Sequence, residues 1–154
     1  MIVYRICVEE FSTDLSGLGA MKYGGRWNTK GNAVLYTSSS CALATVEYAV
    51  HLRLGNSQNY FRLVSIEIPE GIFVKQLGFE NLDNNWKSFP FQFSTQKIVN
   101  KWIKSNESLA LKVPSVIVQW ESNCLINPQH EDFSKVILIG NEPFVFDPRL
   151  INTK

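Results

Sequence analysis

Short apolar runs separated by polar turn residues dominate this chain, and most of them are typical of β-strands. The segment from Ile2 to Val8 is rich in β-branched and aromatic residues, a composition that favours a strand. Further strands are predicted at Val34 to Thr37, Phe61 to Ile68, Ile72 to Val74, Ser115 to Trp120, Lys135 to Ile139 and Phe144 to Phe146. Since most of these strands follow one another through turns rather than helices, the pattern predicts an α+β fold with a mixed or antiparallel sheet and few helices.

A first helix is predicted to begin at the serine run 38–40, which offers N-caps, and to continue to about Leu54. Glu47 lies about 40° from the direction of Leu43, on the flank of the apolar stripe of this helix. A carboxylate beside a core-facing stripe is unfavourable unless it is paired, hydrogen-bonded or lines a cleft. Glu47 is therefore either a site residue or an edge glutamate that reaches water or pairs with Arg53 or a lysine.

The segment from Glu9 to Gly31 shows no periodic pattern, and more than half of the nine glycines of the chain fall within it. A glycine-rich loop of this length inside a compact domain is usually functional or disordered. The second predicted helix comes much later, from Ser94 to about Ser105. Its apolar side is formed by Ile98, Trp102 and Ile103.

Within the glycine-rich loop, Arg26 follows Gly24 and Gly25, which let the backbone turn tightly and approach a ligand. The planar guanidinium of an arginine suits a phosphate or a carboxylate. The next residue, Trp27, would anchor the loop by burying its ring. The alternative is that Arg26 lies on a mobile surface loop, which the buried ring of Trp27 attaches to the domain. The Gly-Gly-Arg sequence alone does not distinguish a ligand-binding arginine from such a surface arginine.

Two further candidate side chains come from other segments. Tyr36 lies on the short strand before the helix of Glu47, where its ring would stack on a flat heterocycle or pack in the core. Ser115 starts an apolar run without a Gly-x-Ser-x-Gly elbow around it, so a hydrolase nucleophile is not expected. The polar residues that follow this run are interpreted as turn residues: Asn123, Asn127, Pro128 and His130.

The composition indicates one folded domain over residues 1–154, because 45% of the residues are hydrophobic and 19% are charged. A net charge of +1 argues against direct binding to nucleic acid or to an anionic membrane. The three cysteines are far apart and odd in number, so no disulfide framework is expected. Because neither a signal peptide nor a membrane-spanning run is recognised, we expect a cytoplasmic location.

Standard metal and nucleotide motifs are not found in the sequence. His51 and His130 are the only histidines, and they do not have the spacing of metal ligands, so no metal site is predicted. Neither a Walker loop nor a G-x-G-x-x-G sequence is present. A nucleotide would therefore have to be held without these phosphate cradles.

Taken in order, several short motifs resemble the RES-domain family. They are Tyr4-Arg5, Gly24-Gly25-Arg26-Trp27-Asn28, Leu35-Tyr36-Thr37-Ser38, Ala42-Leu43-Ala44 with Glu47, Val113-Pro114-Ser115, and Leu125-Ile126-Asn127-Pro128-Gln129-His130. The family is named for an arginine, a glutamate and a serine, which match Arg26, Glu47 and Ser115. The resemblance extends over nearly the whole chain and is least apparent between residues 71 and 106.

The resemblance implies an activity, a partner and a fold. RES proteins are toxins of bacterial type II toxin–antitoxin pairs, and their partner is an Xre-type antitoxin. Their fold is similar to that of ADP-ribosylating toxins, and they consume NAD+ as a substrate, with no cofactor or metal. A homo-oligomer of the chain is left open.

The implied chemistry assigns roles to the candidate residues. Nicotinamide leaves a ribosyl centre of oxocarbenium character, so Glu47 would stabilise this cation, hold a ribose hydroxyl or act as a base toward the acceptor. Arg26, and less directly Arg5, would bind phosphate or ribose oxygens. Tyr36 would stack on nicotinamide. Ser115 would orient the ribose or nicotinamide end by hydrogen bonding.

The acceptor of the ribosyl group decides the reaction. Water or inorganic phosphate would give hydrolysis or phosphorolysis of NAD+, which is the expected activity. The alternatives are an ADP-ribosyltransferase that modifies a cellular protein, and a nucleotide- or partner-binding module without turnover. The presence of Arg26 and Glu47 counts against the binding module, and the sequence does not separate the remaining possibilities.

Overall fold

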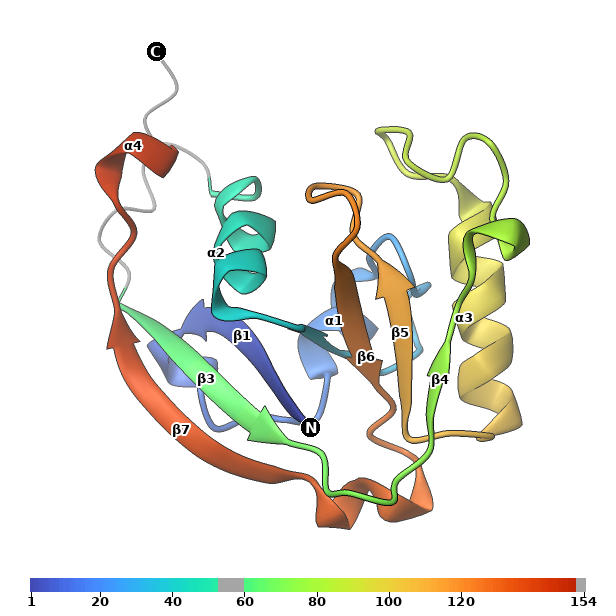
Figure 1. The fold of residues 1–154 in the computed structure, drawn as a ribbon, viewed down its shortest axis with the longest axis horizontal. Helices are drawn as coiled ribbons and strands as arrows, with labels where there is room; N and C mark the ends of the chain where they lie inside the picture. The colour runs from blue at the N-terminus through green and yellow to red at the C-terminus, as the bar shows by residue number, and fades with distance from the viewer. Residues whose placement is uncertain (53–59, 152–154) are drawn as a thin grey trace.

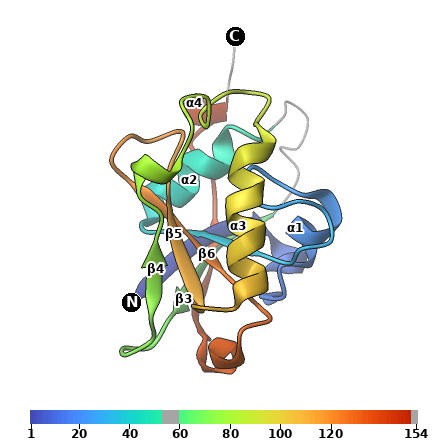
Figure 2. The same cartoon turned by 90° about the vertical axis from the view of Figure 1, so that its right-hand side faces the viewer.

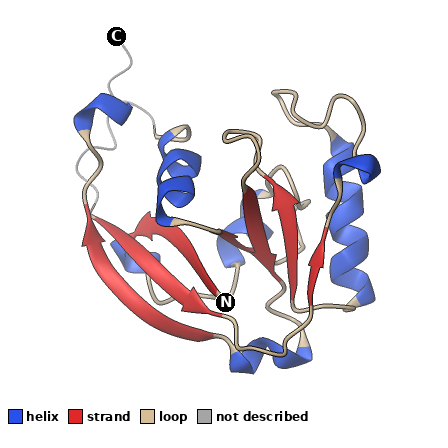
Figure 3. Cartoon of the chain, viewed as in Figure 1, coloured by secondary structure: helices blue, strands red, loops and turns tan. Residues whose placement is uncertain are grey.

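The computed structural model describes residues 1–52 and 60–151, which form a seven-stranded sheet with the order β4-β5-β6-β2-β1-β3-β7 (Figures 1 and 3). The strands are β1 (Ile2–Val8), β2 (Leu35–Ser38), β3 (Phe61–Glu67), β4 (Val74–Gln76), β5 (Ala110–Pro114), β6 (Ser122–Ile126) and β7 (Ile137–Phe144). The α-helices are α1 (Leu18–Tyr23), α2 (Cys41–Ala49), α3 (Phe93–Ser105) and α4 (Pro148–Ile151). None of the described helices is long and apolar enough to cross a membrane.

The sheet is mixed, as the sequence predicts. Strands β4 and β5 pair in parallel, whereas the other neighbouring strands pair antiparallel. Each antiparallel pair can be joined without a crossover helix, which is why strands outnumber helices in this chain. The α+β fold class is thereby confirmed.

The sheet has two halves that meet where β1 pairs with β2 through Tyr4 and Ser38. We call β1, β3 and β7 the long-strand half, and β2, β4, β5 and β6 the short-strand half. Figure 1 shows β3 and β7 on the left and β4, β5 and β6 on the right, with α2 between them. Ala44 and Tyr48 of α2 pack in a core cluster with Ile6 of β1. Helix α2 therefore stands close to the join of the two halves.

Helix α3 packs beside the short-strand half (Figure 2). Its residues Val99, Trp102 and Ile103 are buried in one core cluster with residues of β5 and β6. The predicted apolar side is correct at Trp102 and Ile103, whereas Ile98 is only half-buried and Val99 lies in the core instead. The helix thus covers the sheet much as its periodicity predicts.

The predicted strand from Ser115 to Trp120 is wrong. Strand β5 ends at Pro114, and the following residues form a loop before β6. The Ser115 hydroxyl accepts hydrogen bonds from the backbone N–H groups of Ile117 and Val118, at 3.1 and 2.9 Å. Since these N–H groups are bound within the loop, they do not pair with a neighbouring strand. The apolar run is therefore half-buried or exposed rather than part of the sheet.

The expectation of a loop without regular structure from Glu9 to Gly31 is also wrong in part. This segment contains a 3-10 helix (Glu9–Phe11) and helix α1. Helix α1 has six residues and is flanked by Gly17 and Gly24, whose φ angles of 70° and 71° favour glycine. A helix of this length is too short to produce a recognisable apolar periodicity.

Other boundaries shift by a few residues. The predicted N-cap of α2 is confirmed at Ser40, whose hydroxyl accepts from the N–H of Leu43 at 3.1 Å. The predicted end at about Leu54 is too late, because the helix ends at Ala49 and a turn follows it. Arg53 and Leu54 lie outside the described residues. Strand β4 overlaps its prediction only at Val74. The last two predicted strands, 135–139 and 144–146, are joined in one continuous strand, β7, which contains residues 137–139 and 144 as predicted. Lys135 belongs instead to a 3-10 helix (Glu131–Lys135).

Candidate functional site

Glu47 of α2 lies at the centre of a hydrogen-bonded group that joins three elements. Its Oε1 atom accepts from the Ser115 hydroxyl at 2.7 Å and from the Asn123 amide at 2.5 Å. Ser115 follows β5 and Asn123 belongs to β6, so the ends of two strands fix a side chain of the helix. Within residues 1–52 and 60–151, no hydrogen bond reaches Oε2 of Glu47. The carboxylate is thus held in place through Oε1, while Oε2 is left available to a ligand.

Ser115 uses its hydroxyl entirely within this group. The oxygen donates its proton to Glu47 and accepts two backbone N–H groups, and the residue is 4% exposed. Two N–H donors withdraw electron density from the oxygen, which opposes attack by it on a substrate. Its arrangement fits an orienting residue and supports the expectation that it is not a nucleophile.

Asn123 is a residue that the sequence analysis placed in a turn and that the structure places in the site. It lies on β6 opposite Ser38 of β2, and the Ser38 hydroxyl donates to Asn123 Oδ1 at 2.7 Å. This bond orients the amide so that its N–H₂ group points to Glu47. The apolar run Cys124-Leu125-Ile126 is typical of a short buried strand. A strand predicted there would have placed Asn123 at its start rather than in a turn.

Arg26 binds a distant segment of the chain. Its guanidinium donates to the carbonyl oxygens of Trp86 and Ser88 at 2.7 and 3.1 Å, and it lies 5.8 Å from the centre of the Phe91 ring. Burial lowers the pKa of Arg26 from its ordinary value, and the charge of Glu47 opposes this shift. Arg26 and Glu47 therefore lie within electrostatic range of each other, while two of the guanidinium nitrogens already hold backbone carbonyls.

Tyr36 supports the loop that carries Arg26. Its hydroxyl donates to Oδ1 of Asn28 at 2.7 Å and accepts from the N–H of Trp27 at 3.1 Å, and burial raises its pKa well above the ordinary range. A Cβ atom on Gly25 would come within 2.8 Å of this hydroxyl. This close approach explains why position 25 is a glycine, since any larger residue would collide with the Tyr36 hydroxyl. Trp27 is buried, which confirms its predicted role as the anchor of the loop.

Among the described residues, no hydrogen bond or ion pair joins Arg5 to Glu47. Its guanidinium donates to the carbonyl oxygens of Asp14 and Phe11 at 2.9 and 3.4 Å. Because side chains alternate along β1, Arg5 shares a face with Val3 and Cys7, while Ile6 faces the cluster that contains α2. Its predicted contact with the substrate stays a prediction.

A pocket of about 170 Å³ lies beside the Glu47 group. It is lined by Phe79, Lys87, Ser115, Gln119 and Trp120. Ser115 thus belongs both to the wall of this pocket and to the hydrogen bonds of Glu47. Glu47 does not line the pocket itself, but its hydrogen-bond partner Ser115 connects the carboxylate to the pocket wall.

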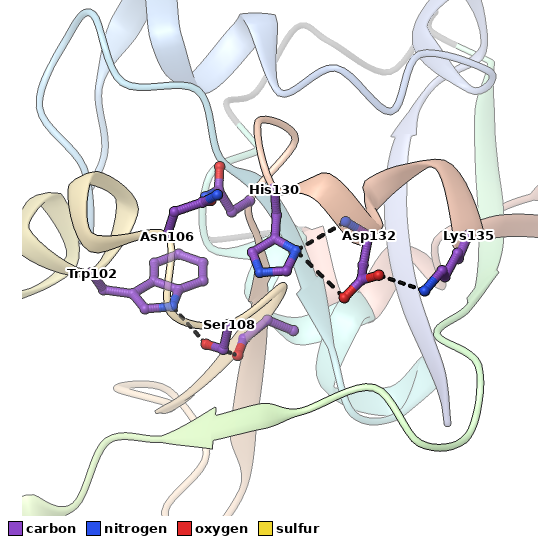
Figure 4. A network of polar contacts seen from close by, with 8 residues as sticks. Trp102, Asn106, Ser108, His130, Asp132 and Lys135 are labelled. Carbon is purple, nitrogen blue, oxygen red and sulfur yellow. Dashed lines mark hydrogen bonds and ion pairs between the residues drawn. The ribbon is translucent and has the colours of Figure 1, made fainter.

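The histidine predicted to be a turn residue has a structural role at another part of the molecule (Figure 4). Nδ1 of His130 accepts from the backbone N–H of Asp132 at 3.1 Å and caps the 3-10 helix 131–135. Asp132 also pairs with Lys135. Figure 4 shows Trp102 nearby, donating from its indole N–H to Ser108 at 2.8 Å. In the described part of the chain, no three His, Cys, Asp or Glu side chains are grouped as metal ligands.

Comparison with known sequences identifies a family. The sequence model of the RES domain family matches residues 2–147. A protein of Yersinia enterocolitica named Toxin Res is 40% identical over 153 residues, which cover 97% of this chain and 99% of that protein. A protein of a Sphingobium species named Prs ADP-ribosylating toxin is 39% identical over 142 residues, which cover 90% of this chain and 87% of that protein.

Comparison with solved structures supports the fold. A chain in the crystal structure of the MbcT–MbcA toxin–antitoxin complex of Mycobacterium tuberculosis superposes with a TM-score of 0.79. The match covers 97% of this chain and 86% of that chain at 18% sequence identity. This chain therefore shares its fold with that chain, and the expected similarity to ADP-ribosylating toxins stays a prediction.

Proposed function

Because this chain belongs to the RES domain family, we propose that it is the toxin of a type II toxin–antitoxin system and that it breaks the nicotinamide–ribose bond of NAD+. The observation that carries the proposal is Glu47, a carboxylate fixed by two side-chain donors, one of which, Ser115, lines a pocket. The names of the Yersinia and Sphingobium relatives as toxins support it. Since NAD+ is the substrate, neither a cofactor nor a metal is needed.

Glu47 is the group that suits the reacting centre. When the C–N bond breaks, nicotinamide leaves as a neutral molecule with the bonding electron pair, and the ribose carbon becomes cationic. The anchored carboxylate offers Oε2 to this cation or to a ribose hydroxyl without first having to reorganise. A water or phosphate oxygen then bonds to the ribose carbon and loses its proton, for which Glu47 is the nearest base in the group described.

Arg26, Tyr36 and Ser115 complete the proposed site. Ser115 keeps Glu47 in place and lies at the pocket wall, where it can orient the ribose. Arg26 retains guanidinium N–H groups beyond those bound to Trp86 and Ser88, and these are available to phosphate oxygens. Tyr36 holds the Arg26 loop through its hydroxyl, and its ring is the proposed platform for nicotinamide.

Transfer of ADP-ribose to a protein is the second candidate function. The name of the Sphingobium relative, an ADP-ribosylating toxin, favours it. The same Glu47 would then activate a side chain of the target protein in place of water or phosphate. The two reactions differ in their acceptor and share the cleavage of NAD+.

Product analysis separates these reactions. Purified protein is incubated with NAD+, with and without phosphate and with and without bacterial proteins, and the products are identified by mass spectrometry. Nicotinamide with ADP-ribose indicates hydrolysis, a phosphorylated ADP-ribose indicates phosphorolysis, and a mass increase of a protein indicates transfer. If NAD+ is stable in all four mixtures, the proposed enzyme activity is wrong and a binding module is favoured.

We also propose that an Xre-type antitoxin silences the chain in the cytoplasm by covering the site. The support is a pair of exposed apolar rings that line the pocket, Phe79 and Trp120, which a hydrophobic segment of a partner would bury. Phe89 and Phe93, also exposed, belong to the segment that continues from Lys87 into α3. Co-expression should restore the growth and the NAD+ level that expression of the toxin alone reduces. Antitoxin that binds equally well at saturating ADP-ribose, in a complex that still consumes NAD+, would show that occlusion is not the mechanism.

A further inference from the structure

The pocket beside Ser115 is built from two segments that lie far apart in the sequence. The loop between β5 and β6 contributes Ser115, Gln119 and Trp120, and the connection from β4 to α3 contributes Phe79 and Lys87. Figures 1 and 2 show both segments at the same end of the sheet. A volume of about 170 Å³ is smaller than the roughly 300–1,000 Å³ that encloses a whole drug-sized ligand. The pocket therefore suits one part of a dinucleotide.

The backbone holds an aromatic ring at the rim of this pocket. Trp120 is 89% exposed, and its φ angle of 72° lies in the left-handed region, which is rarely adopted by a bulky residue. The turn closed by the Ser115 hydroxyl fixes the loop that precedes it. Backbone strain combined with an exposed indole is an arrangement found where a ring is kept ready for a ligand. Phe79 supplies a second ring, 55% exposed.

A cation lies at the same pocket and is held there by Arg26. Lys87 stands between Trp86 and Ser88, whose carbonyl oxygens the Arg26 guanidinium binds. Its Nζ atom is 5.3 Å from the centre of the Trp86 ring. Among the described residues, no carboxylate lies within ion-pair distance of Lys87. Arg26 therefore fixes the segment that brings an unpaired positive charge to the pocket.

We propose that this pocket binds the adenosine phosphate half of NAD+, with adenine between Trp120 and Phe79 and a phosphate at Lys87. The proposal rests on the proposed function. Two exposed rings stack on any flat base, and a lysine attracts a phosphate. The cationic nicotinamide ring does not suit this pocket, because Lys87 would repel it. Nicotinamide belongs instead on the Glu47 side of Ser115, where the carboxylate attracts its positive charge.

Binding of ADP tests the pocket without any turnover. Calorimetry compares ADP with adenosine on the intact chain and on the variants Trp120→Ala, Trp120→Phe and Lys87→Ala. Loss of one stacked base–ring contact should weaken ADP binding about tenfold in Trp120→Ala, and Phe should restore most of it. Lys87→Ala should weaken ADP binding and leave adenosine binding unchanged. Phe73→Ala and Lys104→Ala, at exposed residues outside the pocket, are the matched controls.

Kinetics place the pocket relative to the reacting bond. Trp120→Ala should raise KM for NAD+ and leave cleavage of nicotinamide mononucleotide, which has no adenine half, unchanged. Equal losses on both substrates, ADP binding that no pocket variant alters, or an intact chain that does not bind ADP would each overturn the proposal. If ADP binds as expected and NAD+ is not consumed, the pocket stands and the proposed reaction fails.

Discussion

The two halves of the sheet differ in strand length and in the chemistry they carry. In the long-strand half, β1, β3 and β7 have 7, 7 and 8 residues, whereas the strands of the short-strand half have 3 to 5. The pairing of β1 with β3 is continuous from Ile2 to Val8. Long, continuously paired strands provide a frame, and short strands bring their ends and the following loops close together.

Buried polar side chains show the same division. The short-strand half and the segments packed on it contain most of them: Asn28, Thr37, Ser38, Thr95, Ser108, Ser115 and Asn127. The core of the long-strand half is formed by apolar residues such as Val64 and Ile66. Apolar burial is non-directional, whereas hydrogen bonds fix geometry. Both halves contribute apolar residues to the core, but the comparison assigns the positioning of Glu47 to the short-strand half.

The largest effect is expected in the frame. Ile66 of β3 is fully buried, so Ile66→Ala should lower the free energy of unfolding by about 2–5 kcal/mol. Chemical denaturation measures this loss, and Ile137→Ala, at an exposed position of β7, should change it little. Activity per folded molecule should stay at the parent value at low temperature. A specific loss of activity in the folded fraction would contradict the division between the halves.

Glu47→Gln should give the opposite result. The amide keeps the size of the side chain and an oxygen that accepts from Ser115 and Asn123, but it removes the negative charge. Loss of such electrostatic stabilisation typically lowers turnover by about 10²–10³-fold. Nicotinamide release is measured beside a thermal melt, with the exposed Glu70→Gln as control. Activity within a few-fold of the parent would show that the charge of Glu47 is not needed for the reaction. A strongly lowered melting temperature would show that Glu47 is mainly a structural carboxylate.

Asn123→Asp should change the pH profile of the reaction. The new carboxylate would lie against Oε1 of Glu47, and two adjacent like charges oppose their joint ionisation. A more alkaline pH is then needed for the charged form, so the acid limb of the activity profile should move upward by about one unit or more. Activity at neutral pH should fall and recover as the pH is raised. Asn123→Ala, which removes the donor but adds no charge, should lower activity and move the limb in the same direction by a smaller amount. A profile unshifted in Asn123→Asp would show that Asn123 does not act through Glu47.

The smallest effect is expected for Arg26→Lys. An ammonium group cannot reproduce a planar fork that binds two carbonyl groups, so the segment with Trp86 and Ser88 should loosen. We expect NAD+ or ADP-ribose affinity to fall about tenfold, which is about 1.4 kcal/mol, as measured by calorimetry. The control is Arg62→Lys in the long-strand half, where the arginine binds Asn141 of β7. If Arg26→Lys binds NAD+ or ADP-ribose with the affinity of the parent, Arg26 contributes only its positive charge and not its planar geometry.

Local sequence signals determined much of the frame and part of the site. The β-branched run of β1, the serine cap of α2 and the periodicity of α3 each act within one element, and each is found close to its predicted place. The residues matching the family motifs were also visible in the sequence. Glu47 and Ser115, chosen separately, are joined by a direct hydrogen bond.

Only the tertiary structure decided how these residues are held. Arg26 binds carbonyl groups 60 and 62 positions away, and Asn123 reaches Glu47 across 76. Such partners follow from the packing of whole elements, and no local pattern contains them. The same reason explains the wrong strand at Ser115, whose apolar run resembles a strand, whereas its hydroxyl binds the N–H groups that a strand would need. Apolar spacing therefore specified the elements of this protein, and directional hydrogen bonds between distant elements specified its site.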